Sequence, residues 1–160
     1  MMRWPAASNW LAVPRWRLTG ARRPVARCAP HPASSVGRRP ILVVEDEPAI
    51  RALLVEFLRG EGYAVAVARD GQEALHLLEA AGPAERPGVV LLDMMLPRMD
   101  GAELLRQMRA RGLTVPVVAM SASHEALSRA LAAGARATVP KPFDLDRLLQ
   151  TLQHQMAATA

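Results

Sequence analysis

From residue 41 onward, short runs of aliphatic residues alternate with longer segments in which apolar residues recur at helical spacing. The short runs are typical of buried strands. They occupy residues 41–44, 63–67, 89–92, 115–119 and 136–139, of which the last is the weakest. Strict alternation of five strands with five helices over residues 41–157 predicts a parallel sheet covered on both faces. Because five units are too few for an eight-stranded barrel, we expect an open, doubly wound α/β sheet.

Capping residues indicate where the helices begin and end. Pro48 stands at the first position of the first helix, where a missing N–H is tolerated. Aspartates precede the second, third and fifth helices and are expected as N-caps: Asp70, Asp100 and Asp144. Gly134 ends the fourth helix. Because the predicted strands are parallel, the segments that lead from each strand to the next helix meet at one edge of the sheet. Folds of this kind bind ligands at that edge.

The N-terminal segment differs from the rest of the chain in charge and pattern. Residues 1–40 hold eight arginines and no acidic residue, which gives +8, while the remaining 120 residues carry −3. Five prolines and the absence of any apolar period predict that residues 1–38 are a disordered basic tail containing Arg, Pro and Trp. Three other interpretations stay open: a targeting peptide, a nucleic-acid or membrane-surface binding segment, or an over-long translation start.

Composition excludes several classes of protein. The single cysteine, Cys28, rules out an internal disulfide framework and a cysteine-based zinc site. The apolar runs are much shorter than a bilayer requires, so no transmembrane segment is expected and we predict a cytoplasmic protein. The hydrophobic content of 51% is enough to build a core over the body of the chain.

Chemically active side chains follow four of the five predicted strands. They are Glu45, Asp46 and Glu47 after the first, Asp93 after the third, Ser121 after the fourth and Lys141, the only lysine, after the fifth. Carboxylates held close together repel one another and need a cation at neutral pH. Oxygen ligands without histidine or cysteine suit Mg²⁺ or Mn²⁺. Such an ion, a lysine and a hydroxyl would together suit a phosphoryl group.

Four ordered motifs resemble the receiver domain of bacterial two-component response regulators. They are Val-Val-Glu-Asp-Glu-Pro (43–48), Leu-Leu-Asp-Met-Met-Leu-Pro-Arg-Met-Asp-Gly (91–101), Ala-Met-Ser-Ala (119–122) and Lys-Pro-Phe (141–143). The resemblance covers about residues 40–157. It implies a flavodoxin-like five-stranded sheet of order 2-1-3-4-5 with five helices. We therefore divide the chain into a tail (1–38), a receiver domain (39–157) and a C-terminal end (158–160).

The resemblance also implies a role for each motif residue. Asp93 would be the phosphoacceptor, phosphorylated by a histidine kinase or a phosphotransfer protein. The metal ligands would be Asp46, Asp93, the backbone carbonyl of Met95 and, through water, Glu45. Ser121 would be the switch hydroxyl, and Lys141 would bind a phosphoryl oxygen, with a cis Lys141–Pro142 bond. The expected function is a phosphoryl-accepting switch rather than a classical enzyme.

Three positions depart from the common pattern or tune it. Thr138 stands where the family usually has an aromatic residue that moves inward on phosphorylation. Met95 and Ser123 occupy two variable positions that tune dephosphorylation in this family, and neither is acidic or amidic. We therefore expect slow self-hydrolysis and a weakened coupling between the site and the output face.

The partners follow from the same resemblance. The chain ends at Ala160, soon after the last helix, so we expect a stand-alone receiver with no DNA-binding domain. Its output would be contact with a downstream protein through the fourth and fifth helices and the fifth strand, and a homodimer stays open. The alternatives are a tail-mediated nucleic-acid or membrane binder regulated by the receiver, and a small Asp-dependent phosphatase. The phosphatase is disfavoured because Met95 stands where that family has a second aspartate.

Overall fold

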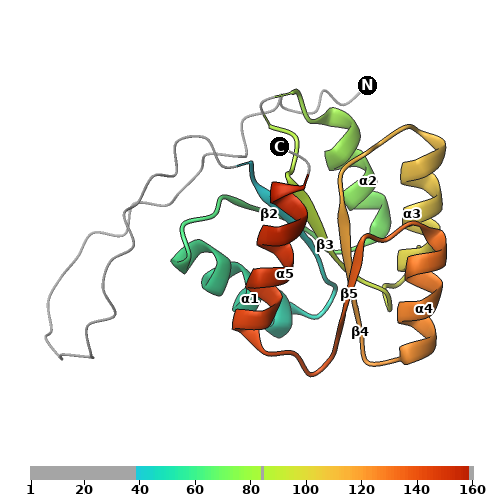
Figure 1. Cartoon of the computed structure of the whole chain (residues 1–160). Helices are drawn as coiled ribbons and strands as arrows, with labels where there is room; N and C mark the ends of the chain where they lie inside the picture. The colour runs from blue at the N-terminus through green and yellow to red at the C-terminus, as the bar shows by residue number, and fades with distance from the viewer. Residues whose placement is uncertain (1–38, 84, 159–160) are drawn as a thin grey trace, which may run out of the picture. The chain divides into compact units, whose positions relative to one another are not determined.

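The computed structural model describes residues 39–83 and 85–158, and the expectations for residues 1–38 and for the last two residues fall outside them. The described residues form five strands and five helices in strict alternation (Figure 1). The strands are β1 (Ile41–Val44), β2 (Val65–Ala68), β3 (Val89–Asp93), β4 (Val117–Ser121) and β5 (Ala137–Pro140). The helices are α1 (Pro48–Gly60), α2 (Gly71–Ala80), α3 (Gly101–Ala110), α4 (His124–Ala133) and α5 (Leu145–Ala157).

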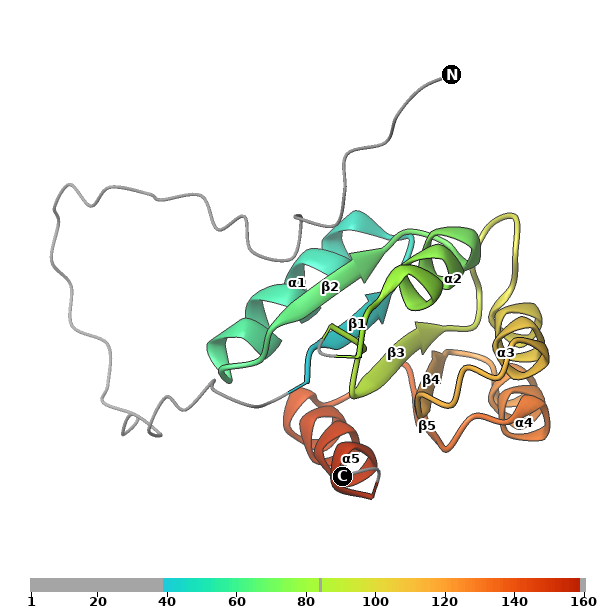
Figure 2. The ribbon, with the colours of Figure 1, turned by 90° about the horizontal axis from the view of Figure 1, so that it is seen from above.

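All five strands are parallel and follow one another in the order β2-β1-β3-β4-β5 (Figure 2). The predicted flavodoxin-like architecture is confirmed. The order reverses at β1, which pairs with β2 on one side and β3 on the other. The carboxyl ends of β1 and β3 are therefore neighbours, and β4 lies next to β3.

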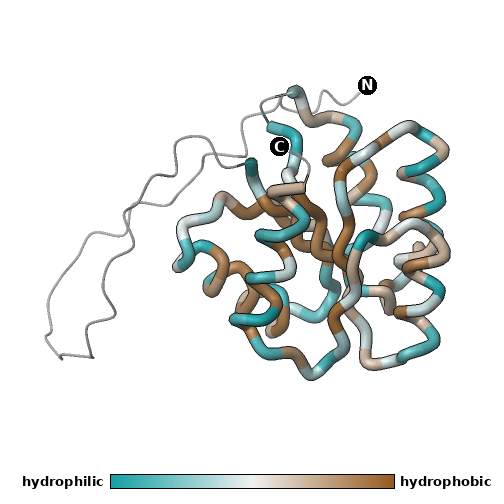
Figure 3. Tube along the Cα trace, in the orientation of Figure 1, coloured by the Kyte–Doolittle hydropathy of each residue, from teal (hydrophilic) through white to brown (hydrophobic). Residues whose placement is uncertain are grey.

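Alternate strand residues feed two apolar layers. In β1, Leu42 and Val44 belong to the apolar cluster that includes residues of α2, α3 and α4, whereas Ile41 and Val43 belong to the cluster that includes residues of α1 and α5. All four are fully buried, as expected for a strand covered on both faces. Figure 3 shows the brown, hydrophobic stretches of the chain concentrated in the strands between the helices. Burial of the central strands thus holds the sheet in place, and the predicted functional residues lie at its carboxyl edge.

The predicted helix caps are present. The side chains of Asp70, Asp100 and Asp144 accept hydrogen bonds from the backbone N–H three residues on, at 2.9, 2.7 and 2.9 Å. Gly134 closes α4 with a φ of 112°, a left-handed conformation that favours glycine. The three aspartate caps therefore fix where α2, α3 and α5 begin, directly after the loops at the carboxyl edge of the sheet.

Two strands begin two residues later than the sequence pattern predicts, and the fifth begins one residue later, at Ala137. The second strand starts at Val65 rather than residue 63, because the amide of Tyr63 donates to the carbonyl of Leu58 and closes α1. The fourth starts at Val117 rather than residue 115, because Pro116 has no N–H for the ladder. Strands β3 and β4 also end later than predicted: Asp93 is the last residue of β3 and Ser121 the last residue of β4, rather than residues that follow the strands.

Candidate functional site

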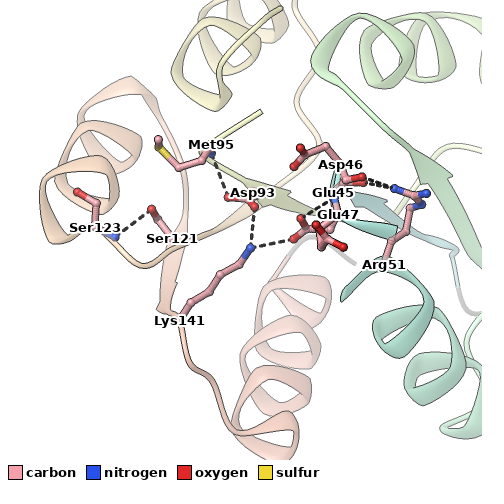
Figure 4. Close-up of polar contacts among 9 residues, drawn as sticks. All are labelled: Glu45, Asp46, Glu47, Arg51, Asp93, Met95, Ser121, Ser123 and Lys141. Carbon is pink, nitrogen blue, oxygen red and sulfur yellow. Dashed lines mark hydrogen bonds and ion pairs between the residues drawn. The ribbon is translucent and has the colours of Figure 1, made fainter. Parts of the chain in front are cut away.

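Glu45, Asp46, Asp93 and Lys141 come together at the carboxyl edge of the sheet (Figure 4). One carboxylate oxygen from each of the three acids lies within 4.8 Å of the other two. Glu45 and Asp46 follow β1, Asp93 ends β3, and Lys141 follows β5. The parallel order of the strands is what brings residues far apart in the sequence to this point.

Asp93 is buried, with 5% of its surface exposed, and both its oxygens are engaged. Oδ1 accepts the amide of Met95 at 3.0 Å, and Oδ2 accepts Nζ of Lys141 at 2.6 Å. The backbone around Asp93 is tightly packed against α3. A Cβ added to Gly101 would lie 2.9 Å from Cα of Met94 and 3.0 Å from the carbonyl oxygen of Asp93. A side chain is therefore excluded at Gly101.

Lys141 bridges two carboxylates, since its ammonium also lies 2.9 Å from Oε2 of Glu45. Burial by itself would lower the pKa of Lys141, but the hydrogen bonds to Asp93 and Glu45 outweigh burial and raise it. The ammonium therefore keeps its charge at neutral pH. The Lys141–Pro142 peptide bond is cis, as expected.

Glu45 is the most deeply buried of the three acids, with 1% of its surface exposed. Burial raises the pKa of Glu45, the hydrogen bond from Lys141 lowers it, and the nearby charge of Asp93 raises it again. Its second oxygen, Oε1, accepts the amide of Glu47 at 3.2 Å. Both oxygens of Glu45 are thus committed to protein donors.

Asp46 differs from the other two acids because it is exposed. Within residues 39–83 and 85–158, no hydrogen bond or ion pair engages its carboxylate. A hollow of about 320 Å³ opens beside it, lined by the loop after β3 and by Arg129 of α4. Three oxygen donors, one of them open to solvent and without nitrogen or sulfur beside them, fit the ligand preferences of Mg²⁺ and Mn²⁺.

The remaining predicted residues lie around this cluster: Met95 bonds to it only through its backbone amide, and among the described residues no side-chain hydrogen bond joins Ser121, Ser123 or Thr138 to it. Ser121 is 1% exposed, and its Oγ accepts the amide of Ser123 at 3.1 Å rather than bonding to Asp93. Ser123 caps α4, with Oγ accepting the amide of Ala126 at 3.3 Å. The side chain of Met95 is 64% exposed. Thr138 is half-buried in β5 opposite Ala119.

Sequence reasoning missed two arginines that hold the loops around the cluster. Arg51 of α1 donates to the carbonyls of Glu45 and Asp46 at 2.8 and 3.0 Å. Arg98, in the loop after β3, pairs with the N-cap Asp70 of α2 and has a left-handed φ of 66°. The only sequence signal was position, since Arg51 lies three residues after one motif and Arg98 lies within another, and neither position identifies the contact that the side chain makes.

The sequence profile of the response regulator receiver domain matches residues 41–153. The chain belongs to this receiver family. The family is a regulatory module of two-component signalling. Among solved structures, this receiver domain is similar to the Francisella response regulator 1452 receiver domain, at 29% identity and a TM-score of 0.70, over 77% of this chain and 100% of that one.

Another similar structure is the receiver domain of a sensor histidine kinase from Pseudomonas aeruginosa PAO1, solved with a magnesium ion coordinated in its active-site cleft. It is 31% identical, with a TM-score of 0.67, over 76% of this chain and 99% of that one. The chemotaxis protein CheY4 of Vibrio cholerae is 31% identical with a TM-score of 0.66, over 74% and 98% of the two chains.

Curated relatives are longer than this chain. The response regulator MprA of Mycolicibacterium vanbaalenii is 40% identical over 121 residues, which are 74% of this chain and 51% of that protein. The chain thus spans about half the length of the curated relatives it matches. No helix among the described residues is long and apolar enough to cross a bilayer.

Proposed function

We propose that this receiver domain is a phosphoryl-accepting switch in which Asp93 takes a phosphoryl group from a histidine kinase or a phosphotransfer protein. The observation that carries the proposal is the joint position of Asp93, Lys141 and the open Asp46 carboxylate at one sheet edge. The exposed Asp46 carboxylate has no protein partner among the described residues, so it is open to a cation that the two buried acids beside it could share. The magnesium ion in the similar Pseudomonas aeruginosa receiver supports the same assignment.

The residues divide the work according to their contacts. An oxygen of Asp93 forms a bond to phosphorus while the phosphorus–nitrogen bond of the donor phosphohistidine breaks, and the electron pair stays on the imidazole nitrogen. The ammonium of Lys141, which donates a hydrogen bond to Asp93, shifts to donate to a phosphoryl oxygen once the negative charge of the phosphoryl group arrives there. Asp46, Asp93 and the Met95 carbonyl would hold Mg²⁺ directly, with Glu45 acting through water. A bound Mg²⁺ would neutralise charge on the phosphoryl oxygens.

The switch and its output follow from the same site. The hydroxyl of Ser121, whose Oγ accepts the amide of Ser123, turns to donate its proton to a phosphoryl oxygen, which pulls on the N-terminus of α4 because Ser123 caps that helix. The output surface is the face formed by α4, β5 and α5, where Leu131 leaves an apolar side chain 51% exposed. We place the domain in the cytoplasm, where the kinases and phosphotransfer proteins that phosphorylate receivers act.

Phosphoramidate tests the proposal because it carries the phosphorus–nitrogen bond of phosphohistidine in a small molecule. We expect intact-mass spectrometry to detect one added phosphoryl group in the presence of MgCl₂ and none when EDTA replaces it. Phosphorylation that is equally fast in EDTA would contradict the metal-dependent site. No phosphorylation by phosphoramidate, acetyl phosphate or a phosphorylated phosphotransfer protein would contradict the function as a whole.

A further inference from the structure

Arg51 reaches back from α1 to the loop that carries the acidic pair (Figure 4). It is the fourth residue of α1, and its own amide donates to the carbonyl of Glu47, the first bond of the helix. One side-chain nitrogen, Nη1, lies 2.8 Å from the carbonyl oxygen of Glu45 and 3.0 Å from that of Asp46. A single guanidinium thus binds two successive peptide groups.

These two peptide groups lie between the sheet and the helix. β1 ends at Val44, and the hydrogen bonds of α1 begin with the carbonyl of Glu47. The carbonyls of Glu45 and Asp46 therefore belong to neither ladder, and the Arg51 side chain supplies their donor. Because Glu45 is buried and an unpaired carbonyl there would be costly, the Arg51 contact favours one conformation of the loop.

Helix stability does not explain an arginine at this place. A cation near a helix N-terminus opposes the helix dipole, and α1 has no acidic residue in its first turn to offset it. Within the described part of the chain, Arg51 forms no ion pair with a carboxylate, so it leaves the exposed Asp46 carboxylate available to a cation. The planar guanidinium is always charged and carries several donors, which suits it to two adjacent carbonyls.

We propose that Arg51 is a positioning residue for the divalent metal: by fixing the peptide groups of Glu45 and Asp46, it aims the Asp46 carboxylate at the space beside Asp93. This inference rests on the proposed function. Residues that orient metal ligands typically change metal affinity by about tenfold to a hundredfold when they are replaced. Arg51 acts on the ligand backbone and does not touch the ion itself.

Isothermal titration with MgCl₂ alone tests the inference on the full chain and three variants of it. Arg51→Met keeps most of the apolar stem and removes every donor, and we expect its dissociation constant for Mg²⁺ to rise about tenfold or more. Arg51→Lys keeps the positive charge and a hydrogen-bond donor on a shorter side chain. Its affinity for Mg²⁺ should therefore lie between those of the wild type and Arg51→Met. Arg59→Met is the matched control, an exposed arginine at the other end of α1, and should bind Mg²⁺ like the wild type.

Melting temperature in EDTA separates positioning from simple structural support. A merely structural role would lower the melting temperature of the folded Arg51→Met protein and leave its Mg²⁺ affinity unchanged, and that result would overturn the inference. Should Arg51→Met not fold, wild-type affinity in Arg51→Lys would overturn it instead. If the wild type itself fails to bind Mg²⁺, the proposed function fails before the role of Arg51 is reached, so the two failures are distinguishable.

Discussion

Nζ of Lys141 lies 2.6 Å from Oδ2 of Asp93, a residue 48 positions earlier in the chain. The same ammonium also donates a hydrogen bond to Glu45, 96 positions earlier. One side chain after β5 therefore connects the end of β3 with the residue that follows β1. Two buried carboxylates rely on it for charge compensation. The stability of the domain should therefore depend on which cation balances these two carboxylates.

Replacing Lys141 by Met should therefore destabilise the domain in a way that Mg²⁺ corrects. Removing one partner of a buried ion pair costs about 3–5 kcal/mol, and we expect the lower end because the Lys141 side chain is 18% exposed. Urea unfolding in EDTA measures this loss. Adding MgCl₂ should stabilise Lys141→Met by more than it stabilises the wild type, because the ion replaces the lost charge. An equal gain in both proteins would contradict this account.

Asp46→Asn should weaken Mg²⁺ binding strongly while changing the free energy of unfolding in EDTA by less than about 0.5 kcal/mol, since the residue is exposed. Glu47→Gln provides the matched control, because Glu47 is also exposed and contributes only its amide to Glu45. Calorimetric titration with MgCl₂ compares the two. Equal Mg²⁺ affinities in Asp46→Asn and Glu47→Gln would remove Asp46 from the site.

Gly101→Ala should be among the most damaging small substitutions in the domain. The added Cβ would meet the backbone at Met94 and Asp93, which cannot yield without moving the site, so we expect a loss of about 1–3 kcal/mol. Gly60→Ala is the control: no atom lies within 4 Å of its added Cβ, and in the last position of α1 alanine should stabilise slightly. Chemical denaturation of both variants decides, and equal stabilities would refute the close packing at Gly101.

Thr138 should limit how far phosphorylation propagates. With a half-buried threonine in β5 there is no aromatic side chain at this position to become buried, so the coupling should fall short of the usual range of about 1–3 kcal/mol. Beryllofluoride mimics the phosphoryl group. NMR should detect large amide shifts at Ser121 and Ala122 and smaller ones across residues 136–139. Equally large shifts across β5 and α5 would contradict the weak coupling and leave the phosphoacceptor assignment unaffected.

The architecture was predictable because hydrophobic periodicity and capping residues agree along the whole domain. The convergence of Glu45, Asp93 and Lys141 followed as well, since the carboxyl ends of parallel strands meet at one edge. Strand limits were less predictable, because a tyrosine amide used by the preceding helix and a proline without an N–H shifted two of them.

The loop contacts were beyond the sequence pattern. The bonds from Arg51 to two carbonyls depend on the path of the backbone between β1 and α1, which no periodicity encodes. The same holds for Ser121, whose hydroxyl is taken by the Ser123 amide two residues on rather than by Asp93. Residue types at the strand ends thus predicted which groups meet, and the loop geometry determined which of them bond.

The most direct test of the central claim is the position of the phosphoryl group. Full-chain wild type, Asp93→Asn and Asp100→Asn are each incubated with acetyl phosphate and MgCl₂, and their intact masses are compared. Asp100 is the matched control because it lies beside the same hollow, and asparagine should preserve its N-cap. We predict that one phosphoryl group is added to the wild type and to Asp100→Asn, and none to Asp93→Asn. Undiminished phosphorylation of Asp93→Asn would contradict the account.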